Sequence, residues 1–368
     1  MLLNEPLVSA DQNGPSSSRN RWHSLLLGAA ALSAAGLCGA LALCAAPVVG
    51  RPGLVALAEP REHRNEHWPL QLSASEDFVR EWAALCQRHA AEISVGGALA
   101  MVSVFLLASV SWGVSGFANM ALTMKIPQPG LVGAVSFIVM VFSSLSVVCG
   151  LATDWVGVTV AGAKVLVIIL IIMSWALHHE VIFPQDRGVV ARTNSGVAKK
   201  SHNQEGLCKN ISLVGCLLVL IGNELAMPQT SGICNMGRLL TVFAFVRFGV
   251  RGYIDKAKHK HYRFPSSVVL LAWLFTQLGA WLVVLGPILP KTWTVGPFAT
   301  REVATIVGAE MMIISLVMTS YSGHWKRYHR AAAAEAKDEK YYHKLSLQKN
   351  ISIAGGFVMI IGFHLPHL

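Results

Sequence analysis

The chain has 368 residues, of which 53% are hydrophobic and only 14% are charged. A soluble domain carries about a quarter charged residues, so this composition excludes an ordinary soluble enzyme and predicts an integral membrane protein. The formal net charge is +10, but the basic residues cluster between apolar segments and do not alternate with aromatic side chains. That arrangement argues against nucleic-acid binding and favours loops held on one side of a bilayer.

Residues 1–58 are predicted to form an N-terminal leader or a signal anchor. Arg19 and Arg21 precede an apolar run, 24–49, which is long enough to span a bilayer. A basic flank before an apolar run is also typical of a cleaved targeting peptide. Both interpretations stay open, and in either case this part adds an extra hydrophobic segment to the chain.

Residues 59–93 are predicted to hold an amphipathic helix that lies against the membrane or against the other helices. Ser73 is followed three residues later by Glu76, a pattern that caps helix N-termini. Phe78, Trp82 and Leu85 then recur at helical spacing. This segment is expected to lead into the first membrane helix.

Eight apolar segments follow, each about long enough to cross a hydrocarbon core of roughly 30 Å as a helix, although the last is short. They are expected at residues 94–118, 131–152, 155–177, 211–227, 236–254, 266–285, 303–322 and 351–363. Four fall in a first unit, 94–228, and four in a second unit, 234–368. The sequence therefore predicts an all-α, polytopic membrane protein of two four-helix units in tandem.

A repeated block supports the division into two units. Residues 207–222 and 347–362 agree at eight of sixteen positions and lie 140 residues apart. The shared polar residues are Lys209, Asn210 and Ser212 in the first copy and Lys349, Asn350 and Ser352 in the second. Apolar segments share Leu, Val and Gly by chance, but a polar block at the same offset indicates an internal duplication. Each copy is interpreted as a polar helix end followed by a closely packed membrane helix.

The loop charges predict the orientation of the chain. The loops after the first, third, fifth and seventh segments carry most of the Lys and Arg, whereas the opposite loops carry almost none beyond Lys291 and Arg301. By the positive-inside rule the basic loops face the cytosol, stroma or matrix. The C-terminal Leu368 is then expected on the other side of the membrane.

A four-helix unit that ends in a basic-Asn-Ile apolar helix resembles the DoxX-like superfamily, and two such units resemble the Surfeit locus protein four family of cargo receptors. The resemblance covers about residues 73–368 and includes Phe245, Gly249 and Arg251, which match a Phe-x-x-Asp-Gly-x-Arg pattern of that family. Phe248 stands at the position of the acid. The chain also lacks the C-terminal dilysine-type signal of those receptors.

The resemblance implies a non-enzymatic membrane cargo receptor or transport adaptor of the ER or Golgi, with protein cargo held in a groove between the two units. The alternative is a DoxX-like membrane subunit, structural or quinone-linked, of a respiratory or photosynthetic complex in a mitochondrion or plastid. No Ser/His/Asp set, phosphate loop or paired-carboxylate motif indicates enzyme chemistry. The expected partners are membrane lipids together with protein cargo or other membrane subunits.

Charged residues inside predicted spans are candidates for function because a charge in hydrocarbon is costly. Lys164 and Glu310 occupy equivalent places when the third helices of the two units are aligned, so they are hypothesised to pair; the alternative is that Lys164 reaches to the membrane surface. Arg247 is expected to have a structural role or to hold a carboxylate, phosphate or carbonyl group. Arg251 is expected to pair with Asp255 at the helix end.

His178 and His324 occupy equivalent places at the basic-side ends of the third and seventh segments. Two such histidines suggest a haem, a metal or a quinone as alternatives. They lie at the rim of the predicted spans and no second motif supports a cofactor, so both are interpreted as ordinary interfacial histidines and no cofactor is predicted. The seven cysteines contain no CxxC pair and are interpreted as small packing residues.

Overall fold

The computed structural model describes residues 81–367 except for 82–83, 86, 124, 183–193, 259–265, 291, 296–297 and 336. The predicted leader, 1–58, and the predicted capping pattern at Ser73 and Glu76 lie outside the described residues.

The described chain is helical apart from one short antiparallel strand pair, β1 (Thr294–Val295) with β2 (Phe298–Ala299). The long helices are α3 (Ala90–Thr123), α4 (Pro129–Ala152), α5 (Val156–Ile182), α6 (Asn194–Glu224), α7 (Gly232–Lys258), α8 (Ser266–Leu285), α9 (Thr300–Thr319) and α11 (Lys337–His364). Shorter elements are η1 (Gly286–Ile288), the π-helix η2 (Ser320–Trp325), α10 (Lys326–Ala333) and η3 (Leu365–His367).

Six helical stretches within the described residues are long and apolar enough to cross a membrane: Ala90–Leu122, Pro129–Ala152, Val156–Trp175, Gln204–Glu224, Thr300–Ala333 and Glu339–His367. The prediction of an all-helical, polytopic membrane protein is confirmed at this level. Helices α7 and α8 stand where two further spans were expected but are not among the six. The side chains of 248–258 in α7, and of 266–269 and 271–272 in α8, lie outside the described residues, and the described part of α8 contributes the shorter apolar stretch Trp273–Ile288.

The predicted starts of the fourth and eighth helices were wrong. Helix α6 begins 17 residues before the expected Ile211, and α11 begins 14 residues before the expected Ile351. The Lys-Asn-Ile-Ser blocks therefore lie inside helices and not at polar ends. Their polar side chains are buried or partly buried because the two helices pack together at this level and satisfy one another's polar groups.

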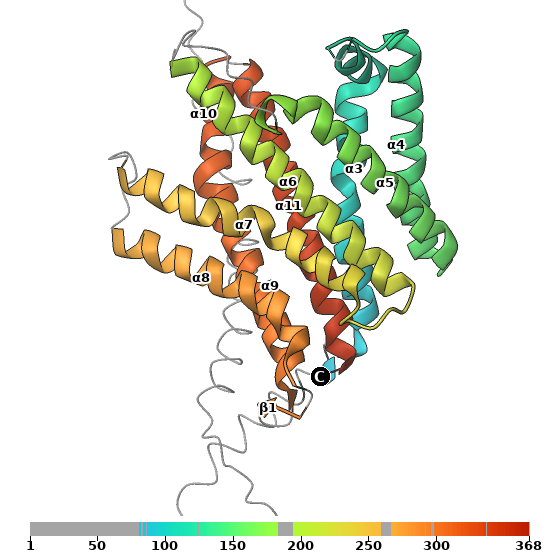
Figure 1. Cartoon of the computed structure of the whole chain (residues 1–368), viewed down its shortest axis with the longest axis vertical. Coiled ribbons are helices and arrows are strands. Elements are labelled where there is room, and N and C mark those ends of the chain that lie inside the picture. The colour runs from blue at the N-terminus through green and yellow to red at the C-terminus, as the bar shows by residue number, and fades with distance from the viewer. Residues whose placement is uncertain are drawn as a thin grey trace, which may run out of the picture.

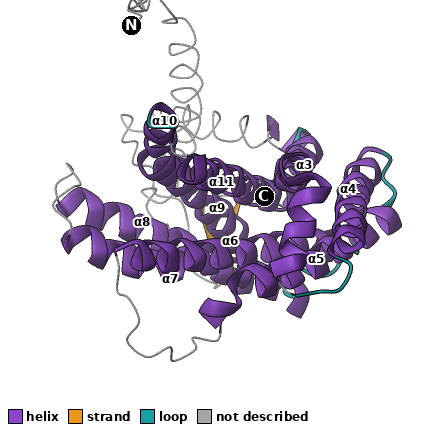
Figure 2. Cartoon of the chain, turned by 90° about the horizontal axis from the view of Figure 1, so that it is seen from above, coloured by secondary structure: helices purple, strands orange, loops and turns teal. Residues whose placement is uncertain are grey.

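The eight long helices form a closed ring, and two of them, α6 and α11, also contact each other across it. Along the chain α3 packs on α4, α4 on α5, α5 on α6, α6 on α7, α7 on α8 and α8 on α9. Helix α9 packs on α11, and α11 closes the ring against α3 and also contacts α6. Seen from above, α4 and α8 lie at opposite ends of the molecule (Figure 2), and α11 runs beside α6 through its middle (Figures 1 and 2).

Glycines bring the ring helices into close contact at two crossings. A Cβ on Gly355 of α11 would lie 2.6 Å from the carbonyl oxygen of Gly97 in α3. A Cβ on Gly237 of α7 would lie 3.0 Å from the carbonyl oxygen of Gly215 in α6. Small residues at such crossings let membrane helices approach closely. Gly97 and Gly237 differ by 140 in number, as do Gly215 and Gly355, so the two crossings use equivalent positions of the repeat.

Helix α3 changes direction at Gly113. This residue has φ 57° and ψ −170° inside the helix, a backbone conformation that is essentially restricted to glycine. The change of direction lies one residue after Trp112, whose side chain packs against the buried core and stacks edge-on against Phe117 at 5.4 Å.

Candidate functional site

The two Lys-Asn-Ile-Ser blocks meet across α6 and α11. The Lys349 Nζ donates a hydrogen bond of 2.7 Å to the Asn210 side-chain oxygen. The Asn210 amide donates to Ser174 Oγ at 3.1 Å, and the Asn350 amide donates to Ser320 Oγ at 2.9 Å. The predicted repeat residues are thus brought together at one level of the bundle.

Beside this contact, Glu205 of α6 holds a second set of polar groups. One carboxylate oxygen lies 2.6 Å from Lys209 Nζ and 3.1 Å from His324 Nε2. The other oxygen accepts a hydrogen bond of 2.7 Å from the Tyr342 hydroxyl. The π-helix η2 contains His324, and a π-helical turn inserts one extra residue and so redirects the side chains that follow it. Glu205 thereby neutralises the ammonium group of Lys209 inside the protein.

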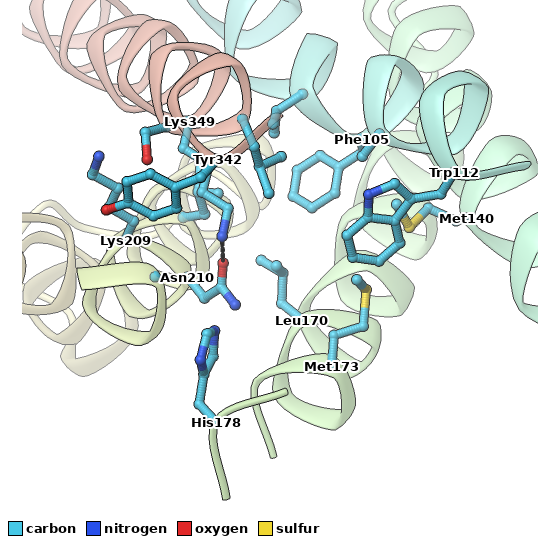
Figure 3. A pocket seen from close by; sticks show the side chains of 16 residues that line it. Phe105, Trp112, Met140, Leu170, Met173, His178, Lys209, Asn210, Tyr342 and Lys349 are labelled. Atoms are coloured by element: carbon cyan, nitrogen blue, oxygen red, sulfur yellow. Dashed lines mark hydrogen bonds between the residues drawn. The ribbon is translucent and has the colours of Figure 1, made fainter. Parts of the chain in front are cut away.

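A cavity of about 250 Å³ lies next to these groups, between α3, α4, α5, α6 and α11. One side is polar and includes His178, Lys209, Asn210, Tyr342 and Lys349 (Figure 3). The other side is apolar and is formed by Phe105, Trp112, Met140, Leu170 and Met173 (Figure 3). Such a cavity suits a molecule with one polar end and one apolar end.

His178 is a polar residue of this cavity whose hydrogen-bonding groups have no described partner. It is only 7% exposed, and neither ring nitrogen has a hydrogen-bond partner among the residues that the structure describes. Its ring lies against Gly206, where a Cβ would approach the ring to 2.8 Å. Burial, and next the charge of Lys349, lowers the pKa of His178 to about 4. The ring is therefore neutral near pH 7, with one N–H donor and one acceptor nitrogen.

A second polar cluster surrounds the C-terminal end of α11. His364 Nδ1 contacts the Glu302 carboxylate, and Arg238 lies 3.3 Å from the other His364 nitrogen. Arg238 also donates to the Gln229 carbonyl oxygen at 2.7 Å, and Arg301 Nε lies 2.5 Å from Glu302. Because these contacts tie α7, α9 and α11 together, we interpret the cluster as structural.

The structure does not bring the hypothesised pair together. Lys164 is exposed on α5, Glu310 is partly buried on α9, and no described ion pair joins them. Arg247 is exposed on α7, and the side chain of Arg251 lies outside the described residues. Helices α5 and α9 lie apart in the ring, so equivalent residues on them face different neighbours.

The two equivalent histidines have different surroundings. His324 belongs to the Glu205 cluster and lies 3.1 Å from His343, nitrogen to nitrogen, whereas His178 faces the cavity. The described residues contain no group of three metal-binding side chains. The residues that could hold a small molecule are His178, Asn210 and Lys349.

Several residues of these clusters were not predicted. Glu205 stands four positions before Lys209, a spacing that pairs opposite charges on a helix and that could have revealed it. Arg238 is a basic residue inside a predicted span and could have been found by the same argument that selected Arg247. Nothing in the sequence marks Glu302, Tyr342 or His364, because their partners come from distant helices.

Comparison with protein-family models, with curated proteins and with solved structures gives no match to this chain.

Proposed function

We propose that this protein is a non-enzymatic membrane receptor or transport adaptor built from two tandem DoxX-like four-helix units, 94–228 and 234–368, in the manner of the Surfeit cargo receptor family. Recurring contacts support the duplication. The Asn210–Ser174 hydrogen bond has its equivalent in Asn350–Ser320. The two Asn residues are 140 positions apart, which is the offset of the repeat. The two Ser residues are as far apart in the sequence as His178 and His324, with which they were aligned.

The observation that carries a binding role is the cavity with two unlike sides. It holds a neutral His178, which has no hydrogen-bond partner among the described residues, and the amine of Lys349 opposite a wall of apolar side chains. Ligand sites are typically apolar cavities with a few convergent polar groups. The seam between α6 and α11 is filled at its centre, where Cys216 packs on Gly356. We therefore place the ligand in this cavity, which α11 of the second unit closes against the helices of the first.

The receptor proposal is tested by locating the full-length protein with a C-terminal tag and by protease protection of the tag. An ER or Golgi position with a protected tag supports a receptor of the Surfeit type with the predicted orientation. A plastid or mitochondrial position excludes that type of receptor.

The same cavity favours a second candidate, a quinone-linked DoxX-like subunit of an organellar complex. Phe105 and Trp112 could stack on a quinone ring, and His178 could donate to one of its carbonyl oxygens. Extraction of a quinone from the purified protein, or its co-migration with electron-transfer subunits on a native gel, would support this candidate. A purely structural subunit would show the complex without the quinone.

A further inference from the structure

Equivalent lysine and histidine residues in the two halves of the chain indicate what kind of ligand the cavity binds. Lys209 of the first unit and His324 of the second both contact the carboxylate of Glu205, at 2.6 and 3.1 Å. Their equivalents are Lys349, at the repeat offset from Lys209, and His178, aligned with His324. Lys349 and His178 both line the cavity. The same two functional groups thus occur twice, once with a carboxylate between them and once without.

The difference lies at one position. The residue equivalent to Glu205 is Leu345, 140 positions later, and Leu345 lines the cavity. Lys349 has Asn210 as its hydrogen-bond acceptor and no carboxylate within ion-pair distance among the described residues. The pair Lys209 and His324 has a carboxylate from the protein. The pair Lys349 and His178 has none among the described residues, so a ligand can supply it.

The charge balance agrees with this comparison. The buried part of the cluster holds two lysines, Lys209 and Lys349, and one carboxylate, Glu205, so it carries a net positive charge when both lysines are protonated. The pKa of His178 lies near 4, so this histidine adds no charge near pH 7. One further negative charge would neutralise the cluster, and an uncompensated charge is costly at the level of a membrane helix.

We propose that the cavity between α3, α4, α5, α6 and α11 binds a carboxylate-bearing amphiphile of the fatty-acid type, with its carboxylate between Lys349 and His178. The apolar chain lies against Phe105, Met140 and Leu170, on the opposite wall (Figure 3). His178 stands three residues beyond the apolar stretch Val156–Trp175, which places the carboxylate near one membrane surface and the chain toward the interior. The cavity of about 250 Å³ is slightly smaller than typical ligand cavities of roughly 300–1,000 Å³, so it suits a medium-length chain.

This inference rests on the proposed binding role of the cavity, and it specifies the ligand. The probe is tritiated decanoate, added to the full-length protein in nanodiscs, with empty nanodiscs to measure partition into lipid. Unlabelled 1-decanol has the same chain without the charge, and decylubiquinone represents the quinone candidate. We expect saturable decanoate binding that neither 1-decanol nor decylubiquinone displaces at equal concentration.

Leu345→Glu supplies the missing carboxylate from the protein itself and should compete with the ligand. We expect it to weaken decanoate binding about tenfold or more relative to Leu345→Gln, which has a similar shape without the charge. Lys349→Met should weaken binding by a similar factor through loss of the ammonium group. Lys164→Met, on the exposed side of α5, should leave binding unchanged. Elution as a single species on size exclusion verifies that each variant is folded.

The outcomes separate the two proposals. If 1-decanol or decylubiquinone binds as well as decanoate, or if Leu345→Glu and Leu345→Gln behave alike, the carboxylate assignment is wrong while the cavity remains a binding site. If none of the three probes binds above empty nanodiscs, both the assignment and the binding role of the cavity fail.

Discussion

At the scale of single residues, Lys209 and Lys349 show how one repeated motif can serve two purposes. Both ammonium groups lie at the level where α6 and α11 meet. Lys209 is neutralised by Glu205, whose side chain is 28% exposed, compared with 10% for Lys209. Lys349 instead donates to the neutral amide of Asn210 and lines the cavity. We infer that the first lysine stabilises the fold, and we propose that the second binds the ligand.

Glu205→Gln removes the carboxylate and leaves Lys209 and His324 without their anionic partner. Breaking a fully buried pair costs roughly 3–5 kcal/mol, and the partial exposure of Glu205 reduces this to about 2 kcal/mol. We expect a clear fall in melting temperature, measured by thermal unfolding in detergent. Glu339→Gln is the matched control, because the Glu339 side chain is 56% exposed beside His343. Equal melting temperatures for the two variants would show that Glu205 is not a stabilising partner.

The sequence reveals the repeated Lys and Asn because they recur in the same order, but it does not reveal their partners. Lys164 and Glu310 were aligned as equivalent residues, yet they do not meet, since α5 and α9 lie apart in the ring. Contact between the two repeat blocks occurs instead on α6 and α11, which pack directly on each other. The hydrogen bond from Lys349 to Asn210 is one such contact between the two blocks. Equivalence in a duplicated sequence therefore predicts similar surroundings and does not predict contact.

At the scale of helices, glycine sets both the close crossings and the change of direction in α3. The crossings of α3 with α11 and of α6 with α7 place backbone against backbone at Gly355 and Gly237. At Gly113 the glycine is required for a different reason, its positive φ. We therefore expect Gly→Ala substitutions at the two kinds of position to destabilise the protein for different reasons.

Gly113→Ala forces an unfavourable backbone conformation on alanine, so we expect it to destabilise the protein by about 1–3 kcal/mol or to straighten α3. Circular dichroism melting in detergent measures the loss. Gly96→Ala is the control on the same helix, where the added Cβ meets nothing within 4 Å. A gain in stability for Gly113→Ala as well as Gly96→Ala would contradict the backbone assigned to Gly113.

Gly355→Ala and Gly237→Ala each insert a methyl group between two backbones, at 2.6 and 2.9 Å from the nearest backbone atoms. We expect each to cost about 1–3 kcal/mol, as overpacking does in other cores. Gly157→Ala, with open space around it, should have little effect. Chemical denaturation measures the free energy of unfolding of the three variants. An unchanged stability of Gly355→Ala would show that α3 and α11 do not cross there.

Hydropathy predicts that these helices exist, and it predicts their ends less well. Helices α4 and α8 begin and end within two residues of the expected segments. The starts of α6 and α11 were misplaced because hydropathy finds only the apolar part of a helix, and both helices begin with a polar stretch of sequence. The break at Gly113 could not be predicted, since nothing in the local sequence distinguishes it from Gly116, which stays helical.

At the scale of the whole molecule, two sets of four helices form one closed ring in which α6 and α11 also pack on each other. The first helix of each set packs on the last helix of the other set: α3 on α11, and α7 on α6. This exchange places the unit-one cavity partly under α11, so Lys349, from the second half of the sequence, completes a site in the first half. Composition and the repeated block predict the helices and the duplication, whereas the exchange depends on packing between distant helices and could not be read from the sequence.

The measurement that tests the account most directly is identification of what the protein retains from its own membrane. The full-length protein, purified gently and extracted with organic solvent, would be compared by mass spectrometry with the Leu345→Glu variant. We expect about one carboxylate amphiphile per chain in the natural protein and its loss from Leu345→Glu. Retention of a quinone or a neutral lipid, unchanged in Leu345→Glu, would contradict it.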